Sequence, residues 1–259
     1  MLRIKAIVRN AQTNISLSAS IILISLSSLS ACAGIGTQDT KAADYNAELG
    51  IRYLQQGRLK LANVKLLKSL EQNPNSVPAN HYYALLQQKL KQPKVATRHF
   101  ERAIRYAPKN PELRNNYGSF LCKNNHPKAA VQQFLTAVKD PLYSTPEFAY
   151  TNAGICLRKY NPASPEAEQY FRTALKKKAS FPSALLEMGK LYKDRGDYQK
   201  AQAFMLRYET VGQSSPDALQ LCAIINSKIG DPAKAKMCKS TLLRLFPSSP
   251  EAEQIGSTR

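Results

Sequence analysis

The sequence predicts an all-α fold, a superhelix of about six helical hairpins that occupies residues 43–259. Three observations predict it. A self-similar block recurs about every 34 residues, small and large apolar residues return at fixed places in each block, and the chain after residue 31 lacks strand-like alternation and any Gly-rich phosphate loop. One such hairpin cannot bury its apolar face alone, so we expect neighbours to stack around a continuous core.

Each block places a small residue on its first helix opposite small residues on its second helix, the pattern of tetratricopeptide repeats. At position 8 we expect a packing role, not a catalytic one, for Gly50, Ala84, Gly118, Gly154, Gly189 and Ala223. Asp197 and Asp231 stand where a carboxylate can cap the second helix of a hairpin. The repeats are expected near 43–76, 77–110, 111–146, 147–181, 182–215 and 216–249.

The first 31 residues predict a bacterial export signal and not part of the fold. Arg3, Lys5 and Arg9 form a positive start, and an apolar, Ser-rich stretch follows. A transmembrane anchor would need about 20 predominantly apolar residues, and the serines dilute this stretch too heavily.

The stretch ends in Leu29-Ser30-Ala31-Cys32, which resembles the bacterial lipobox at all four positions. Cys32 is therefore expected to become the lipidated first residue of the mature chain, with several acyl chains giving stable anchoring. The alternative is an ordinary secretory signal followed by an unrelated cysteine. Because Ala33 and Gly34 follow, without Asp, the resemblance implies the periplasmic face of the outer membrane. Residues 32–42 are expected to form the lipidated N-terminus and a flexible tether.

The full chain carries a net charge of +19, and removal of Arg3, Lys5 and Arg9 leaves +16. Such a balance favours anionic partners without dictating the fold. We expect no nucleic-acid partner, because no recognition motif is present and the chain is exported. Phosphate-bearing lipid headgroups, an acidic partner protein or a merely solvated basic surface are the alternatives.

The sequence offers no constellation typical of an enzyme. His81, His99 and His126 lie in different repeats without the spacing of metal ligands, and no nucleophile–base set or paired carboxylates stand out. We therefore predict a protein without catalytic activity, metal, cofactor or small-molecule substrate.

After Cys32 is assigned to the lipid, Cys122, Cys156, Cys222 and Cys238 are left. Four cysteines in an oxidising periplasm suggest two disulfides, with three possible connectivities. The local pairs are Cys122–Cys156, on first helices of adjacent repeats, and Cys222–Cys238, within repeat six; crossed pairs would span two repeats. Buried free thiols are the alternative. The first pair carries a reservation, because its cysteines follow their glycines by four and two residues, so their directions differ.

The concave face, which the first helices line at positions 2, 5, 9, 12 and 13, is the default binding surface of such a superhelix. Repeats one and two give it an apolar strip: Ala47, Ile51, Leu54, His81 and Leu85. Repeats three and four add Asn115, Ser119, Lys123, Phe148, Thr151 and Ile155. Asn116 and Asn152 share position 6, where an amide can bond a bound peptide backbone. A local cap or solvent contact is the alternative for these amides.

Three central segments carry a family resemblance: Asn115-Asn116-Tyr117-Gly118-Ser119-Phe120-Leu121-Cys122, Asp140-Pro141-Leu142-Tyr143 and Asn152-Ala153-Gly154-Ile155-Cys156. With the lipobox and the six repeats, they resemble the type IV pilus biogenesis lipoproteins called PilF or PilW. The resemblance covers essentially the whole mature chain. It also implies a disulfide between Cys122 and Cys156, which correspond to the family's cysteine pair.

The resemblance implies a pilotin, which travels to the outer membrane by its lipid and promotes localisation and multimerisation of the pilus secretin. The expected partners are then a secretin subunit, other pilus assembly proteins and the membrane, with the N-terminal apolar strip as the preferred secretin contact. The competing interpretation is a general periplasmic scaffold that organises peptidoglycan enzymes or outer-membrane protein assembly.

Overall fold

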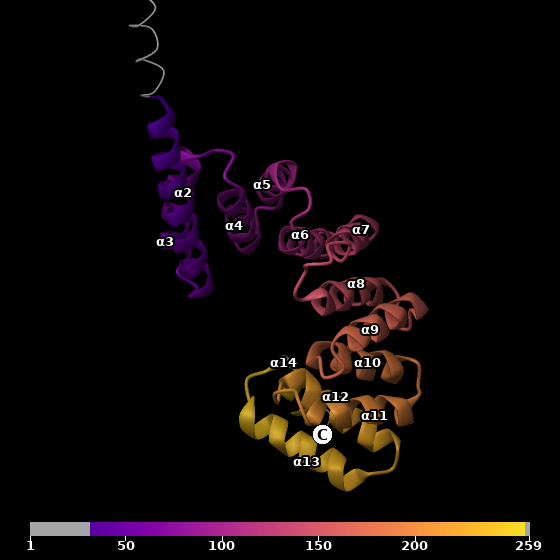
Figure 1. Ribbon diagram of the computed structural model, residues 1–259. Helices are drawn as coiled ribbons and strands as arrows, with labels where there is room; N and C mark the ends of the chain where they lie inside the picture. Colours follow the sequence, from indigo (N-terminus) through magenta and orange to yellow (C-terminus); the bar gives the residue numbers. More distant parts are fainter. Residues whose placement is uncertain (1–31, 257–259) are drawn as a thin grey trace, which may run out of the picture. The chain divides into compact units, whose positions relative to one another are not determined.

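The computed structural model describes residues 32–256 and the side chains of residues 40–255. All described elements are α-helices, which confirms the predicted all-α class. The chain divides into two compact units, unit 1 up to Ala107 and unit 2 from Pro108 (Figure 1). Unit 1 contains α2 (Cys32–Gln55), α3 (Leu59–Gln72), α4 (Val77–Lys89) and α5 (Pro93–Tyr106). Unit 2 contains α6 (Pro111–Lys123), α7 (Pro127–Ala137), α8 (Pro146–Tyr160), α9 (Pro165–Lys177), α10 (Pro182–Asp194), α11 (Tyr198–Glu209), α12 (Pro216–Lys228), α13 (Pro232–Leu245) and α14 (Pro250–Gly256).

Consecutive helices pack as hairpins. Proline and N-cap residues in the sequence mark where most of these helices begin. Proline occupies the first turn of most of them, where its missing N–H breaks no hydrogen bond. Ser or Asn precedes several of these prolines and accepts a hydrogen bond from a first-turn amide. Asp197 and Asp231 accept hydrogen bonds from the amides of Lys200 (3.1 Å) and Lys234 (2.9 Å), so both predicted caps are confirmed.

The position-8 glycines bring the two helices of a hairpin together, as expected. A Cβ atom on Gly118 would lie 2.7 Å from the ring of Phe134, and one on Gly154 would collide with the ring of Phe171. Both rings are fully buried. The missing side chain therefore leaves the space that the large residue of the second helix fills.

Each unit has an apolar core between its hairpins. In unit 1, buried side chains of α2, α3 and α4 form one cluster: Leu54, Ala62, Leu66 and Leu86. In unit 2 one cluster lies around Phe171, Met188 and Leu191. The short helix α14, which the sequence analysis did not anticipate, packs on α12 and α13 with Ala252 buried. It covers the last hairpin, as a terminal cap does in repeat proteins.

The N-terminal segment differs from the prediction. Residues 32–42, expected as a flexible tether, form the first turns of α2. The reason is local: the segment contains no proline, and Ala42 and Ala43 carry helical periodicity into the packed part of the helix. The predicted export signal, residues 1–31, lies outside the described residues, and so does the side chain of Cys32. None of the described helices is both long enough and apolar enough to cross a membrane.

Candidate partner-binding site

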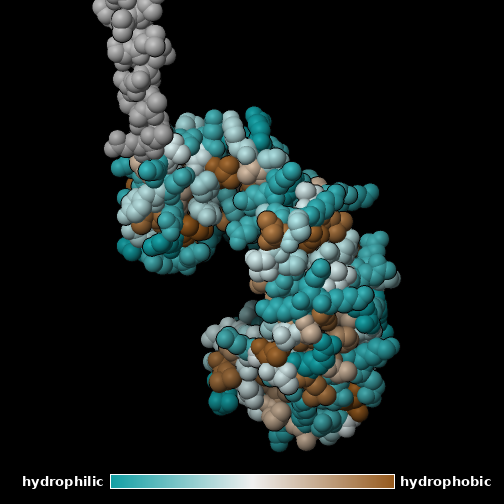
Figure 2. All heavy atoms as spheres, viewed as in Figure 1, coloured by the Kyte–Doolittle hydropathy of each residue, from teal (hydrophilic) through white to brown (hydrophobic). Residues whose placement is uncertain are grey.

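The predicted apolar strip of unit 1 comes from α2 and α4, two helices that pack against each other. Ile51 and Leu85 are half-buried and pack on the same core cluster, together with the half-buried ring of Tyr82. These side chains thus form an apolar surface with one side still facing solvent. Figure 2 shows that on the visible face of this unit hydrophobic residues lie between hydrophilic ones.

Three residues of the predicted strip are not available to a partner, and the prediction was wrong for them. Ala47 is fully buried, and Leu54 and His81 are almost so. The register assigns a side chain to a face of its helix but does not tell how deeply packing buries it. Leu54 packs with Leu66 of its own hairpin and with Leu86 of the next.

His81 lies among aromatic rings and is uncharged at neutral pH. Its ring centroid is 5.3 Å from that of Tyr82 and 6.1 Å from that of Phe100. Burial disfavours the imidazolium form and lowers the pKa of His81 from 6.5 to about 4. His81 is therefore a core histidine, with consequences for stability and not for recognition.

The predicted polar residues of unit 2 lie together on α6 and α8. The Asn152 side chain donates a hydrogen bond to the side-chain oxygen of Asn115 (3.0 Å), and both are partly buried. The Ser119 hydroxyl donates to the backbone oxygen of Asn115 (3.1 Å). Asn116 is partly buried, whereas Ile155 is 40% exposed. Because an amide has two donors and an oxygen with two lone pairs, the Asn115–Asn152 pair keeps capacity for a peptide backbone.

Other register residues near this pair add apolar surface. Phe148 is 44% exposed and meets the ring of Phe181 edge-on, with centroids 4.7 Å apart. Thr151 is buried, and its hydroxyl lacks a hydrogen-bond partner within the described part of the chain. In the connector before α8, the Leu142 side chain is 89% exposed. Unit 2 thus presents a mixed face of amide and apolar groups, beside α6 and α8.

Further along unit 2, the same register positions carry ion pairs that the sequence analysis missed. Arg158 of α8 pairs with Glu187 and, at 3.0 Å, with Asp194, both on α10. Lys190 pairs with Glu187 (2.9 Å) and with Asp217 of α12. Burial alone would lower the pKa of Lys190, but the two carboxylates outweigh it and raise that pKa. The groove register, continued to position 12 of repeat four and into repeats five and six, would have placed Arg158, Lys190 and Asp217 on this face, although not shown which of them pair.

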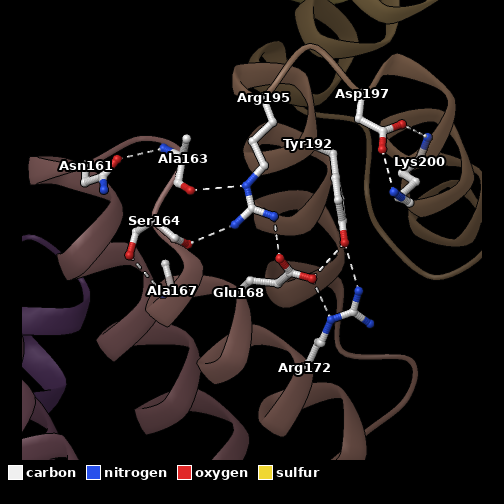
Figure 3. A network of polar contacts seen from close by, with 10 residues as sticks. All are labelled: Asn161, Ala163, Ser164, Ala167, Glu168, Arg172, Tyr192, Arg195, Asp197 and Lys200. Carbon is white, nitrogen blue, oxygen red and sulfur yellow. Dashed lines mark hydrogen bonds and ion pairs between the residues drawn. The ribbon is translucent and has the colours of Figure 1, made fainter.

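A second polar network joins α9 to α10 (Figure 3). Its centre is the Glu168 carboxylate, which accepts hydrogen bonds from Arg195, from the Tyr192 hydroxyl (2.7 Å) and from Arg172 (2.7 Å). Arg195 also donates to the backbone oxygens of Ala163 (3.1 Å) and Ser164 (3.2 Å), just before α9. Burial favours the protonated acid, but these hydrogen bonds outweigh it and lower the pKa of Glu168 to about 2. The network fastens two hairpins of unit 2 together.

The cysteines of unit 2 lie where the two local pairings require. The sulfur atoms of Cys122 and Cys156 are 2.16 Å apart and link α6 with α8, despite their different register positions. Those of Cys222 and Cys238 are 2.01 Å apart and link α12 with α13. The close packing of first helices in adjacent hairpins brings the Cα atoms of Cys122 and Cys156 within 5.7 Å.

The described residues contain no cluster of His, Cys, Asp and Glu that could hold a metal ion. An apolar cleft of about 580 Å³ lies between α7, α8 and α9, lined by Val131, Leu157, Tyr160 and Tyr170. The described side chains are suited to binding a partner: they comprise exposed apolar residues, the Asn115–Asn152 amide pair and ion-paired charged residues on packed helices.

Comparison with known proteins decides the family. Residues 99–132 match the tetratricopeptide repeat model. The type IV pilus assembly protein PilF of Pseudomonas aeruginosa is 31% identical over 221 residues, which cover 85% of this chain and 86% of that protein. The chain belongs to the PilF family. The resemblance inferred from the central segments and the tetratricopeptide fold are therefore confirmed.

Solved structures of this family agree with the assignment. The structure of PilW, a type IV pilus biogenesis factor, superimposes with a TM-score of 0.74 at 28% identity, covering 82% of this chain and 97% of PilW. That of Pseudomonas aeruginosa PilF gives 0.73 at 29% identity, covering 86% of this chain and all of PilF. An uncharacterized protein of Haemophilus influenzae is 32% identical over 115 residues, 44% of this chain and 64% of that protein.

Proposed function

We propose that this protein is an outer-membrane lipoprotein that binds a subunit of the type IV pilus secretin and promotes its localisation and multimerisation. The single observation that carries the proposal is family membership, because the similarity to a type IV pilus assembly protein spans 85% of the chain. Pilus assembly proteins other than the secretin are further partners under this proposal.

The mechanism is non-catalytic. Acyl chains on Cys32 tether the protein to the periplasmic face of the outer membrane, and the helical frame captures a secretin segment. Tethering raises the effective concentration of the bound subunit at the membrane where it multimerises. The half-buried apolar side chains of α2 and α4, Ile51, Tyr82 and Leu85, are the preferred contact. They can bury more apolar surface with a partner without leaving the core cluster on which they pack.

Two experiments test the proposal. The double variant Ile51→Asp with Leu85→Asp should lose co-purification of the secretin, because a carboxylate on this surface opposes apolar burial. The control variant Leu206→Asp with Met237→Asp makes the same charge change at exposed positions of α11 and α13 and should keep it. Circular dichroism must show unchanged helicity in both. Full co-purification by the folded Ile51/Leu85 variant would overturn the contact assignment.

The lipid role is tested separately. Cys32→Ala should leave the secretin multimer outside the outer membrane or unassembled, as followed by membrane fractionation and its resistance to heat in detergent. A correctly placed multimer in that strain would overturn the carrier mechanism. Deletion that alters cell shape while pili stay intact would favour the general envelope scaffold instead.

A further inference from the structure

The outward face of α3 combines exposed apolar and basic side chains. Val64 is 58% exposed, and Leu61 and Leu67 are each more than a third exposed. Lys60 and Lys68 are exposed on the same face. At 100° per residue these five lie within one third of the helix circumference, opposite the core residues Ala62, Leu66 and Ser69. Within the described part of unit 1, the neighbouring helices leave these five side chains exposed.

The outward face of α5, in the next hairpin of the same unit, is almost purely basic. Lys94, Arg98, Arg102 and Arg105 are exposed, and Glu101 is the sole acidic residue of the helix. The opposite side is the core face, with Phe100 fully buried. The two outward faces together are called the basic face of unit 1 below.

Few carboxylates neutralise these cations. Residues 40–107 contain 12 Lys and Arg against 4 Asp and Glu. Within that part of the described chain the one ion pair joins Arg52 to Glu48, and neither residue belongs to the basic face. Residues 108–256 contain 21 basic and 13 acidic residues, which make ten ion pairs. Unit 1 therefore carries cations whose counter-charge is left to solvent or to a ligand.

We propose that the basic face of unit 1 docks on a layer of anionic phospholipid headgroups. Lysines interspersed with exposed aliphatic side chains suit such a layer, because their stems lie along the acyl boundary while their ammonium groups reach the phosphates.

The position of the lipid supports this partner over an acidic protein, and on this point the inference rests on the proposed function. The Ser69 hydroxyl of α3 donates to the backbone oxygen of Ala43 (2.6 Å). Ala43 stands eleven residues after Cys32 in α2, about 17 Å along the helix axis. With α2 lying along the bilayer surface, an acylated Cys32 would hold the outward face of α3 beside the headgroups, and the cations of α5 would add attraction within about a Debye length.

The test measures vesicle binding without the lipid, so that lipidation itself does not enter. The chain from residue 33 onward keeps all helices that the structure describes. It should co-sediment with vesicles of phosphatidylglycerol and phosphatidylethanolamine, release on raising the salt concentration, and leave phosphatidylcholine vesicles unbound. Lys60→Glu with Lys68→Glu should weaken binding by about tenfold or more, because each cation near an anionic surface contributes to the attraction. Val64→Ser with Leu67→Ser should weaken it by about threefold and preserve the salt dependence.

The matched control reverses two exposed lysines of α9 in unit 2, Lys176→Glu with Lys177→Glu, and changes the net charge equally. It should bind within about twofold of the unaltered chain. Equal weakening by both charge reversals, or no binding by the unaltered chain, would overturn the proposal. So would a Lys60/Lys68 variant that keeps vesicle binding but loses secretin co-purification in detergent, which would assign the face to an acidic protein. If co-purification fails for the unaltered chain while vesicle binding persists, the secretin proposal fails and this one stands.

Discussion

The two units of this chain achieve stability in different ways. Unit 2 contains both cysteine pairs and ten ion pairs, several of which connect neighbouring hairpins. In unit 1 the described residues make one ion pair, at the exposed surface, and the hairpins are held by the apolar cluster around Leu66 and Leu86. The net charge is +8 for residues 40–107 and also +8 for the more than twofold longer range 108–256.

The difference indicates that the charged side chains of unit 2 mainly stabilise its packing, whereas those of unit 1 are free to meet a partner. In unit 2 charged side chains satisfy one another, which fixes the hairpins as a frame. In unit 1 charges are left exposed next to half-buried apolar residues, which is the composition of a surface that meets partners. The secretin contact and the phospholipid contact are both proposed in unit 1. Because the two units are stabilised differently, we expect reduction of the cysteines to destabilise unit 2 alone and mild acid to destabilise unit 1 first.

The largest expected effect comes from the cysteines. If both pairs are oxidised, reduction with a thiol should destabilise unit 2 by about 3–4 kcal/mol per bridge, as chain entropy predicts for separations of 34 and 16 residues. Amide hydrogen exchange, resolved by helix, should show lost protection in α6, α8, α12 and α13 while α2 to α5 keep theirs. Cys122→Ala with Cys156→Ala should reproduce the loss in α6 and α8 without reductant. Unchanged exchange on reduction would mean that the cysteines are free thiols.

A second loss of stability, of comparable size, is expected at acidic pH and should begin in unit 1. The pKa of His81 is about 4 in the folded protein and 6.5 when unfolded, so the unfolded state binds more protons between these values. Stability is therefore fully present above pH 6.5 and falls by about 3 kcal/mol as the pH drops towards 4. Burial, with Arg102 and Arg98 nearby, also lowers the pKa of His99 and acts in the same direction.

Unit 2 should resist until the solution is more acidic. Because its hydrogen bonds lower the pKa of Glu168 from 4.5 to about 2, this carboxylate contributes stability above pH 4.5 and loses it as the pH falls towards 2. Exchange protection factors at pH 5 should drop in α4 and α5 but not in α9 and α10. His81→Leu is the control and should remove most of the drop. Simultaneous loss in both units would contradict separate titration.

The sequence was sufficient for features that depend on local pattern. The 34-residue period predicts the all-α fold, and the caps at Asp197 and Asp231 follow from residue type and position alone. The sequence was insufficient for features that depend on how helices pack against one another, such as burial and ion pairing. Periodicity puts Ala47 and His81 on a face but does not tell that packing buries them. The Arg158–Glu187 pair joins residues 29 apart, so only the stacking of helices reveals it.

The smallest expected effect compares one cap in each unit. Ser76 and Ser164 both accept a hydrogen bond from the amide three residues on, Ala79 (3.3 Å) and Ala167 (3.2 Å) respectively. Ser76→Ala should cost about 1 kcal/mol in unfolding free energy, the usual value of such a cap. Ser164→Ala should cost about half as much, because Arg195 still holds the backbone turn before α9 through two carbonyl oxygens.

Urea unfolding of each variant, with exchange in α4 and α9 as local readouts, measures the difference between these two caps. Ser76→Asp and Ser164→Asp serve as matched rescues, since Asp caps a helix as well as Ser does. Combining Ser164→Ala with Arg195→Ala should raise the cost beyond the sum of the single changes, because both hold the same helix start. If Ser164→Ala alone costs as much as Ser76→Ala, the network around Glu168 joins the hairpins without supporting the start of α9, and the greater fixation of unit 2 lies in its side-chain pairs alone.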